Sequence, residues 1–332
     1  VIKEDALFNF AQLCFELSLS PFNEAISAFT RYIQEYPNSP RTEAAYDYLL
    51  DAFMSAKNYQ RAIATIESLD YKNSKVDMAY QRLTYIRGQE LFISQKYADA
   101  IDMFDKSIAN GKYNRDLESL AHYWKAEANY RLGNVDVAVD QFKEIVNALG
   151  SINLEEYGRA HYNLGYAYFD KKQYTVANSW FRKYEKIADN AENVVINDTY
   201  NRIADCYYIN RDFTAASEYY KKAVNIGLVE TDYSLYQLSL TYGGLKMANE
   251  KIGALQRLLR EYPNSEYASN AMFGIARAYQ TDLNVEDSAK YYYEMLIAEY
   301  PHSANKSTAL SSLGAIEFNR RHFDNALNYY KQ

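Results

Sequence analysis

Apolar residues recur along the chain in blocks of two stretches each. Within each stretch they fall at positions i, i+3, i+4 and i+7, and a short polar segment separates the two stretches. Residues 155–170 and 174–188 show the arrangement well, with the polar Lys171, Lys172 and Gln173 between them. This spacing places the apolar residues on one face of an α-helix. The pattern therefore predicts pairs of helices joined by short turns.

The blocks repeat with a nearly constant period. Each contains a small residue followed four positions later by a large apolar one, and successive copies lie 35 to 39 residues apart. We expect the small residue to lie where two helices cross closely, and the large one to fill the space one turn further on. The copies are Ala25/Phe29, Ala62/Ile66, Ala100/Phe104, Ala138/Phe142, Ala177/Phe181, Ala216/Tyr220, Ala289/Tyr293 and Ala326/Tyr330, with Lys251/Leu255 as a degenerate copy.

The period predicts an all-α fold of about nine tandem units. One unit cannot bury its apolar face alone, so neighbouring units are expected to stack into a single solenoid over residues 1–332. The approximate units are 1–39, 40–74, 75–113, 114–152, 153–190, 191–229, 230–265, 266–303 and a truncated 304–332.

Three units end in the sequence Tyr-Pro-x-Ser, at residues 36–39, 262–265 and 300–303, and a weaker copy stands at 71–74. All five prolines of the chain fall between predicted helices, where a missing N–H group is tolerated. We expect the proline to stop the outgoing helix and the serine to cap the next one. The clearest case is Ser39, with Pro40 expected as the first helical residue.

These features resemble the tetratricopeptide repeat (TPR). The residues that carry the resemblance are the small-x3-aromatic pattern, a proline eight residues later, and a Leu-Gly pair such as Leu164-Gly165 or Leu313-Gly314 twelve residues before the small residue. The resemblance covers nearly the whole chain and implies a right-handed superhelix of helix-turn-helix units. The period exceeds the usual TPR length of about 34 residues, which predicts helices extended by about a turn. HEAT-like repeats are the alternative fold.

A finer resemblance connects the chain with bacterial envelope TPR proteins. The Tyr-Pro-x-Ser endings and the run from Tyr123 to Ala128 are similar to the outer-membrane assembly lipoprotein and the periplasmic Tol-Pal coordinator. This resemblance implies a periplasmic or outer-membrane-associated location, with the cytoplasm as the alternative. The printed chain has no uninterrupted apolar run long enough for a transmembrane helix, and its first residues lack the pattern of a signal peptide.

The family resemblance also implies a concave binding surface lined by the first helix of each unit. The inward positions of each first helix lie fifteen and eleven residues before the small residue of the repeated pair. They share one helix face because they are spaced i, i+4, and tyrosine suits recognition of proteins and peptides. The alternative is that most of the 35 tyrosines simply pack in the core. The predicted contact residues are Tyr85 and Gln89, Tyr123 and Glu127, Tyr162 and Tyr166, and Asn201 and Asp205.

The residues give little indication of catalysis or of a cofactor. The chain has none of the common nucleotide-binding, zinc-protease or serine-hydrolase motifs. His122 and His161 occupy equivalent positions in adjacent units, so a shared metal is conceivable, but no further ligands accompany them and packing is the stronger interpretation. Cys14 and Cys206 are expected in the core. The sequence thus predicts no enzyme activity, cofactor or metal.

Charge and chain ends complete the functional prediction. A net charge of −7 without basic clusters argues against nucleic-acid binding. We expect a non-catalytic scaffold that binds a protein or peptide along the concave face; the alternative is a peptide-sensing input module that controls an effector domain elsewhere in the chain. The chain starts without Met, and its last unit lacks a polar outer face. We therefore expect a fragment of a longer solenoid, or end-to-end association through the last unit.

Overall fold

The structure is a computed structural model that describes residues 2–17, 23–69, 73–148, 155–188 and 193–332. These residues form α-helices joined by turns, with a 3-10 turn at Gly111–Tyr113, a π-helical turn at Ala278–Asp282 and no strand among them. In chain order the helices are α1 (Ile2–Glu16), α2 (Asn23–Glu35), α3 (Thr42–Ala56), α4 (Tyr59–Glu67), α5 (Ser74–Ile93), α6 (Tyr97–Ala109), α7 (Arg115–Arg131), α8 (Val135–Asn147), α9 (Glu155–Asp170), α10 (Tyr174–Ile187), α11 (Asn193–Ile209), α12 (Phe213–Ile226), α13 (Thr231–Gly244), α14 (Ala248–Glu261), α15 (Ala268–Arg277), α16 (Glu286–Glu299), α17 (Lys306–Asn319) and α18 (Phe323–Lys331).

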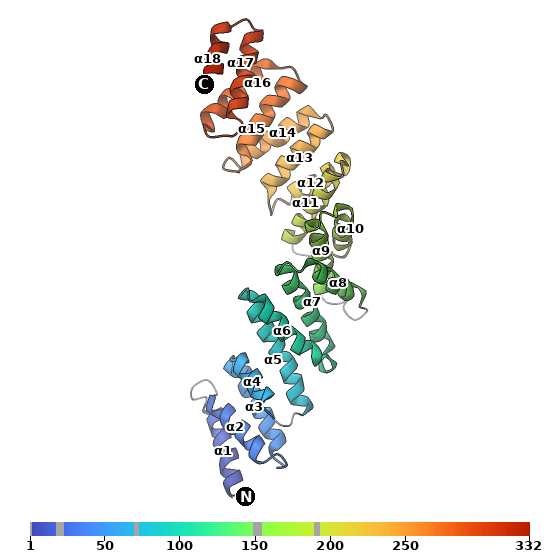
Figure 1. Ribbon diagram of the computed structural model, residues 1–332, viewed down its shortest axis with the longest axis vertical. Helices are drawn as coiled ribbons and strands as arrows, with labels where there is room; N and C mark the ends of the chain where they lie inside the picture. Colours follow the sequence, from blue (N-terminus) through green and yellow to red (C-terminus); the bar gives the residue numbers. More distant parts are fainter. Residues whose placement is uncertain (1, 18–22, 70–72, 149–154, 189–192) are drawn as a thin grey trace. The chain divides into compact units, whose positions relative to one another are not determined.

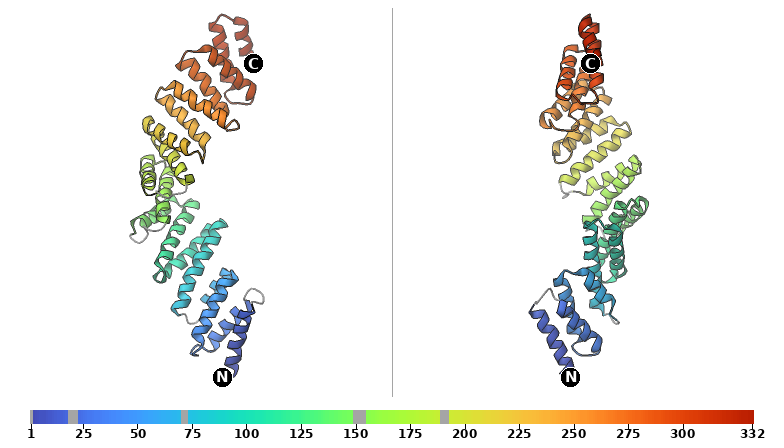
Figure 2. Two further views of the ribbon diagram at one scale, coloured as in Figure 1. Left: turned by 180° about the vertical axis from the view of Figure 1, so that it is seen from behind. Right: turned by 60° about the vertical axis from the view of Figure 1, so that its left-hand side comes forward.

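The helices alternate between two roles. Odd-numbered helices are the first members of the predicted pairs and even-numbered helices the second members, and each predicted unit holds one pair. The one offset is α5, which begins at Ser74. Consecutive helices pack against one another from α1 to α8 and again from α10 to α18, as can be followed in Figures 1 and 2. The prediction of an all-α solenoid of helix pairs is confirmed, whereas the unit boundaries stay a prediction.

The chain divides into two compact parts. The N-terminal part is Val1–Ala167 and the C-terminal part is Tyr168–Gln332, so that the division falls within α9. In each part the helices follow one another in chain order (Figure 1). Each buries a continuous row of apolar side chains, such as Phe29, Leu49, Phe53 and Ile66 in the N-terminal part.

The small residues lie at close helix crossings, as the period predicts. All eight alanines of the repeated pairs are at most 2% exposed, and their large partners are at most 1% exposed with one exception. The exception is Tyr330, which is 54% exposed. At the α5–α6 crossing the facing residue is Gly88, where an added Cβ atom would lie only 2.6 Å from Cε1 of Phe104. The spacing of small and large residues therefore sets how closely the two helices of a pair approach.

The turns between pairs differ in one respect from the prediction. The prolines at 37, 40, 263 and 301 lie outside helices, whereas Pro21 lies outside the described residues. The expectation that Ser39 caps a helix starting at Pro40 is wrong, because α3 begins at Thr42 with Arg41 in the N-cap position. Instead, the backbone N–H of Thr42 donates to the Ser39 carbonyl and closes a tight turn ahead of the helix.

The serine of the Tyr-Pro-x-Ser ending has a recurring role. Its hydroxyl oxygen accepts the backbone N–H two residues later, at 3.2 Å for Ser39, 3.1 Å for Ser265 and 3.2 Å for Ser303. The Ser39 hydroxyl also donates to Glu4, and the Ser265 hydroxyl donates to Asp232 at 2.6 Å. Both carboxylates lie on the preceding first helix. Ser39 and Ser265 therefore join the turn to the preceding first helix as well as ordering it.

Charged side chains join α16 to α17. Glu317 is 1% exposed, and Nζ of Lys290 lies 2.7 Å from its Oε1 atom. Arg320 pairs with Glu286 at 3.0 Å and with Asp287 at 2.8 Å. Lys290, together with His322 and Asn325, lowers the pKa of the Glu317 carboxyl to about 2. The junction is thus a buried apolar contact flanked by two ion-pair clusters.

We predict opposite effects of the same substitution at two helical glycines. Gly88→Ala should lower the free energy of unfolding by about 1–3 kcal/mol, because its methyl group overlaps the Phe104 ring. Gly253→Ala in α14 should raise it by about 0.5–1 kcal/mol, because no atom lies within 4 Å of an added Cβ and alanine favours a helix. Urea unfolding followed by circular dichroism measures both. Equal effects would contradict the assigned crossing.

We also predict a pH-dependent stabilisation from Glu317. Its folded-state pKa of about 2 lies below the ordinary value of 4.5, so its contribution is complete above about pH 4.5 and is lost as the pH falls toward 2. Glu317→Gln should therefore lower the melting temperature at pH 7, and the deficit should shrink at pH 3. The control is Glu299→Gln, at an exposed site on α16. A deficit that is constant with pH would contradict the assignment.

Candidate functional site

The predicted contact residues of the N-terminal part lie along the first helices α5, α7 and α9. Nε2 of Gln89 donates to the Tyr85 hydroxyl at 2.9 Å on α5. Between α7 and α9, Nδ2 of Asn163 donates to Oε2 of Glu127 at 2.6 Å and to the Tyr123 hydroxyl at 3.2 Å. The other Glu127 oxygen accepts from Nε of Arg131 at 2.8 Å. Polar side chains of the predicted set therefore form hydrogen bonds along these helices, and Asn163 is a further member that the repeat count missed.

Burial separates the predicted residues of this part into two groups. Tyr85, Tyr123 and Glu127 are 8%, 4% and 6% exposed, respectively. Burial raises the pKa of the Tyr85 hydroxyl to about 12 and also raises that of Tyr123, so both stay protonated near neutral pH. These three side chains form the supporting layer of the first-helix face.

The other three predicted residues of this part are partly exposed. Gln89, Tyr162 and Tyr166 are all half-buried. The rings of Tyr162 and Tyr166 meet edge to face with centroids 5.0 Å apart. An edge-to-face pair of this kind restrains both rings and leaves part of their surface open to contact. Their role in partner binding stays a prediction.

Asn201 and Asp205 of α11 are buried in the C-terminal part. Oδ1 of Asp205 accepts hydrogen bonds from the hydroxyls of Tyr220 at 2.6 Å and Tyr233 at 2.8 Å. Its other oxygen accepts from Nη1 of Arg202 at 2.6 Å, and Oδ1 of Asn201 accepts from the Ser234 hydroxyl at 2.7 Å. Burial raises the pKa of the Asp205 carboxyl, while Arg202 and the two tyrosines oppose that rise. In the isolated chain these side chains join α11 to α12 and α13.

A groove opens on the first-helix face of the C-terminal part, which we call the α13–α15 groove. It has a volume of about 240 Å³. Two of its lining side chains are cationic and, among the described residues that line it, none is a carboxylate. Its lining residues are Tyr236, Ser239 and Leu240 of α13, Lys251 and Leu255 of α14, Asn270, Phe273, Gly274 and Arg277 of α15, and Asn305. Drug-sized ligands occupy pockets of about 300–1,000 Å³, so this groove suits one or two side chains of a larger partner.

The spacing of the repeat also predicts the residues of this groove, once one irregular interval between small residues is taken into account. Twelve residues separate the buried small residue of the first helix from that of the second in most pairs, as in Gly88/Ala100 and Gly314/Ala326. The interval is thirteen from Ala276 to Ala289, and the π-helical turn at Ala278–Asp282 accommodates the additional residue.

Counting from the small residue of the first helix corrects for this insertion. The inward positions then become Tyr236 and Leu240 on α13, and Phe273 and Arg277 on α15. All four line the groove. Arg277 immediately precedes the π-helical turn, a feature that is frequent at functional sites. The predicted contact residues end at Asp205, although the same spacing, continued into the later units in this way, gives these four positions as well.

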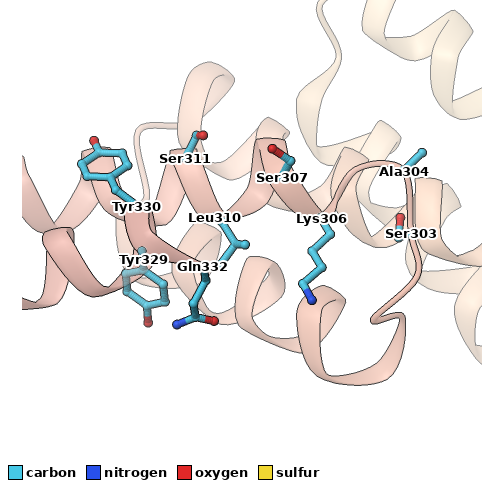
Figure 3. A pocket seen from close by; sticks show the side chains of 9 residues that line it. All are labelled: Ser303, Ala304, Lys306, Ser307, Leu310, Ser311, Tyr329, Tyr330 and Gln332. Atoms are coloured by element: carbon cyan, nitrogen blue, oxygen red, sulfur yellow. The ribbon is translucent and has the colours of Figure 1, made fainter.

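Two further cavities are lined by residues that the structure describes. One of about 430 Å³ lies between α4 and α6 and includes Glu67, Asp102 and Lys106. Part of its charge pairs internally, because Nζ of Lys106 lies 3.1 Å from Glu67 and 3.5 Å from Asp102. The other, of about 360 Å³, lies between α17 and α18 beside Leu310, Ser311 and Tyr330 (Figure 3). The first cavity thus contains an internal ion-pair cluster, and the second lies at the last helix.

His161 and the two cysteines show packing contacts. His161 is 6% exposed, its Nδ1 atom lies 2.8 Å from the Tyr157 carbonyl oxygen, and its ring contacts that of Tyr157. Cys206 is fully buried and Cys14 is half-buried. Over the described residues, no cluster of three or more His, Cys, Asp or Glu side chains is arranged to hold a metal ion. The helices of the described segments are also too short or too polar to cross a membrane.

Comparison with known sequences identifies the repeat. Models described as tetratricopeptide repeat match residues 5–39, 86–151, 153–192, 198–226, 233–265 and 270–303. The chain belongs to the tetratricopeptide repeat family. This result decides against HEAT-like repeats. A search of curated proteins gives no match.

Solved structures support the fold. The C-terminal part of a TPR repeat-containing protein from Cytophaga hutchinsonii aligns with a TM-score of 0.58 at 21% identity, over 74% of this chain and 93% of that chain. The apo form of RapI aligns with a TM-score of 0.55 at 12% identity, over 99% and 95% of the two chains. At these identities the similarity establishes the TPR solenoid and carries no information on the partner.

We predict that Asp205 stabilises the C-terminal part. Asp205→Ala removes the acceptor of the fully buried Tyr220 hydroxyl and one carboxylate partner of Arg202, so the free energy of unfolding should fall by about 3 kcal/mol. Glu230→Gln is the matched control, because Glu230 also pairs with Arg202 but is 52% exposed. Its effect should stay below about 1 kcal/mol. Equal losses in urea unfolding would contradict the assignment of Asp205 as the buried anchor.

Proposed function

We propose that the chain is a non-catalytic scaffold that binds a protein or peptide along its first-helix face, the concave face implied by the TPR fold. The observation that carries this proposal is the α13–α15 groove, which lies on the inward positions of two successive first helices. Its size suits side chains of an extended segment better than a small metabolite. TPR proteins generally act as scaffolds, which supports a binding function in place of catalysis.

The chemistry of the groove favours a partner segment with an acidic residue next to an apolar one. Lys251 and Arg277 supply positive charge in a chain whose net charge is −7. Among the described residues, the ion-pair partner of Lys251 is Asp282, at a distance of 3.9 Å. Beside these cations, Tyr236, Leu240 and Phe273 offer apolar surface. Charge-assisted hydrogen bonds would fix the acidic side chain, and the rings would cover its neighbour.

The N-terminal part contributes a second contact area in this proposal. Gln89, Tyr162 and Tyr166 are the partly exposed members of the predicted set and would touch the partner directly. Tyr85, Tyr123 and Glu127 would hold these residues in place from the layer beneath. In the C-terminal part, Asn201 and Asp205 would have the same supporting role.

We further propose the bacterial cell envelope as the location, in the periplasm or at the outer membrane, with the cytoplasm as the alternative. The Tyr-Pro-x-Ser endings at residues 36–39, 262–265 and 300–303 support this proposal. Fractionation of cells of the source organism tests it. Recovery in the soluble cytoplasmic fraction alone would reject the envelope location.

A displayed library of random peptides tests the groove directly. The 332-residue chain should enrich peptides in which Asp or Glu neighbours an apolar residue. Arg277→Ala should weaken binding of the enriched peptides about tenfold, since each lost charge-assisted contact is worth about 1.4 kcal/mol. The matched control is Arg260→Ala, which removes a 70% exposed arginine of α14 that is not part of the groove lining.

Two results would contradict this proposal. One is enrichment of peptides without acidic residues. The other is equal weakening by Arg277→Ala and Arg260→Ala, which would assign the effect to overall charge. Replacing Asp and Glu of an enriched peptide by Asn and Gln should reproduce the loss seen with Arg277→Ala. Circular dichroism of each variant confirms that the fold is intact.

A further inference from the structure

Helix α1 carries an apolar stripe on its exposed side. Ile2, Phe10, Leu13 and Leu17 are 87%, 54%, 52% and 53% exposed, respectively. The last three are spaced i, i+3 and i+7, and Ile2 lies eight residues before Phe10, so they share one face of α1 and its last turn. An amphipathic helix normally buries such a stripe against a neighbouring element.

The last helix carries a second stripe. Phe323, Leu327 and Tyr330 lie at i, i+4 and i+7 on α18 and are 57%, 51% and 54% exposed. The residue equivalent to Tyr330 in the preceding pair is Tyr293, which is 1% exposed because α17 packs against α16. The stripe on α18 is therefore the surface that a following first helix covers elsewhere in the chain.

The contact between α16 and α17 shows which residues of a first helix cover the preceding second helix. Leu313 and Ile316 of α17 pack in one buried cluster with Tyr293 and Leu296 of α16. When α1 is aligned with α17 through their buried small residues, Ala11 and Gly314, these two positions become Phe10 and Leu13.

The serine contacts support this alignment. Glu4 lies seven residues before Ala11, and Asp232 lies seven residues before the buried Ser239 of α13. Each carboxylate accepts the hydroxyl of a Tyr-Pro-x-Ser serine. The stripe on α1 is therefore the one that a first helix turns toward the preceding second helix.

Positions that hold charged residues at the α16–α17 junction hold apolar residues or cysteine on α18 and α1. At the α16–α17 junction, Lys290 pairs with Glu317 and Glu286 pairs with Arg320. The equivalent positions on α18 hold Leu327 in place of Lys290 and Phe323 in place of Glu286. The equivalent positions on α1 hold Cys14 in place of Glu317 and Leu17 in place of Arg320.

Both members of these two ion pairs are thus replaced together, although the two helices lie at opposite ends of the sequence. The second partner of Arg320, Asp287, has the charged Asp324 as its equivalent on α18. A solvent-exposed helix face has no physical reason to lose its charges in step with another. A contact between the two faces supplies that reason, because an unpaired charge facing an apolar residue would be costly to bury.

We propose that α1 of a second copy of this chain packs on α18 in the way that α17 packs on α16. The pairs brought together would be Cys14 with Leu327 and Leu17 with Phe323, while Phe10 and Leu13 cover Tyr330. The contact joins two different surfaces, so it is heterologous and continues from copy to copy. This inference is independent of the proposed partner groove.

The cavity at the last helix fits this arrangement. It has Ser311 and Tyr330 at the positions that Tyr236 and Leu255 occupy in the α13–α15 groove (Figure 3). In that groove, α15 supplies the opposite wall. In the assembled state α1 of the next copy would supply it here, which extends the first-helix face across the junction.

Sedimentation equilibrium of the 332-residue chain tests the proposal. A single helix-on-helix contact is smaller than the standard interface of about 1,600 Å², so the association should be weak and visible only at high micromolar concentration. The weight-average mass should rise above the monomer value of 38.5 kDa and continue past the dimer. Leu327→Lys and Cys14→Glu should each leave the chain monomeric, because each disables one end.

Mixing the two variants gives the most specific result. Each variant keeps one unaltered end, and the two altered ends would meet as a lysine and a glutamate. The equimolar mixture should therefore associate, and continue past the dimer, although neither variant associates alone. A chain with both substitutions should recover association, because a lysine and a glutamate would then face each other as Lys290 and Glu317 do. The control is Val137→Lys, at a 49% exposed position on α8, which should associate like the unaltered chain.

Three outcomes would overturn the proposal. Loss of association by Leu327→Lys but not by Cys14→Glu would assign a symmetric α18–α18 contact, and the reverse would assign an α1–α1 contact. A strictly monomeric unaltered chain would show that other segments or proteins cover these faces. If Cys14→Glu lowers helicity, Leu13→Lys at a 52% exposed position replaces it.

Discussion

Most helix pairs depend on a crossing at which one helix presents no more than a hydrogen atom or a methyl group to its neighbour. Ala100, Ala138 and Ala177 are fully buried at such crossings, and Gly88 leaves no room even for a Cβ atom. Close approach brings the aromatic partners Phe104, Phe142 and Phe181 into the adjoining space without voids, and dense packing of this kind supplies the dispersion contacts of the core. The first-helix face exists because this contact fixes the orientation of the first helices.

Much of the fold could be predicted because the repeat makes the apolar period visible many times. The identity of each crossing residue, the all-α class and the placement of four prolines outside helices follow from local chemistry. The start of α3 did not follow, because Ser39 uses its hydroxyl for a tight turn and for Glu4, where a helix cap was the expected use. A choice between two hydrogen-bonding partners of one hydroxyl depends on a side chain 35 residues away, which local pattern cannot reveal.

The candidate site was harder to predict for a related reason. Counting identifies which side of a helix a residue occupies, but burial depends on the length and tilt of the next helix. Tyr123 and Tyr162 have the same place in the repeat, yet the first is buried and the second is half-exposed. At α15 the count fails by one position, because the additional residue lies in the π-helical turn that follows this helix and not in a loop. Only the spacing from Ala276 to Ala289 indicates this irregularity.

The π-helical turn at Ala278–Asp282 has an evolutionary consequence. Insertions in repeat proteins are normally tolerated in loops, where they leave the packed faces unchanged. Here the wider turn absorbs the additional residue while Ala276 and Ala289 stay fully buried, and Tyr293 still donates its hydroxyl to Gln280 at 2.8 Å. Residues on one side of the turn can therefore change phase relative to the next unit without loss of the crossing. Such a turn gives a solenoid of nearly fixed period a way to diversify its recognition surface one repeat at a time.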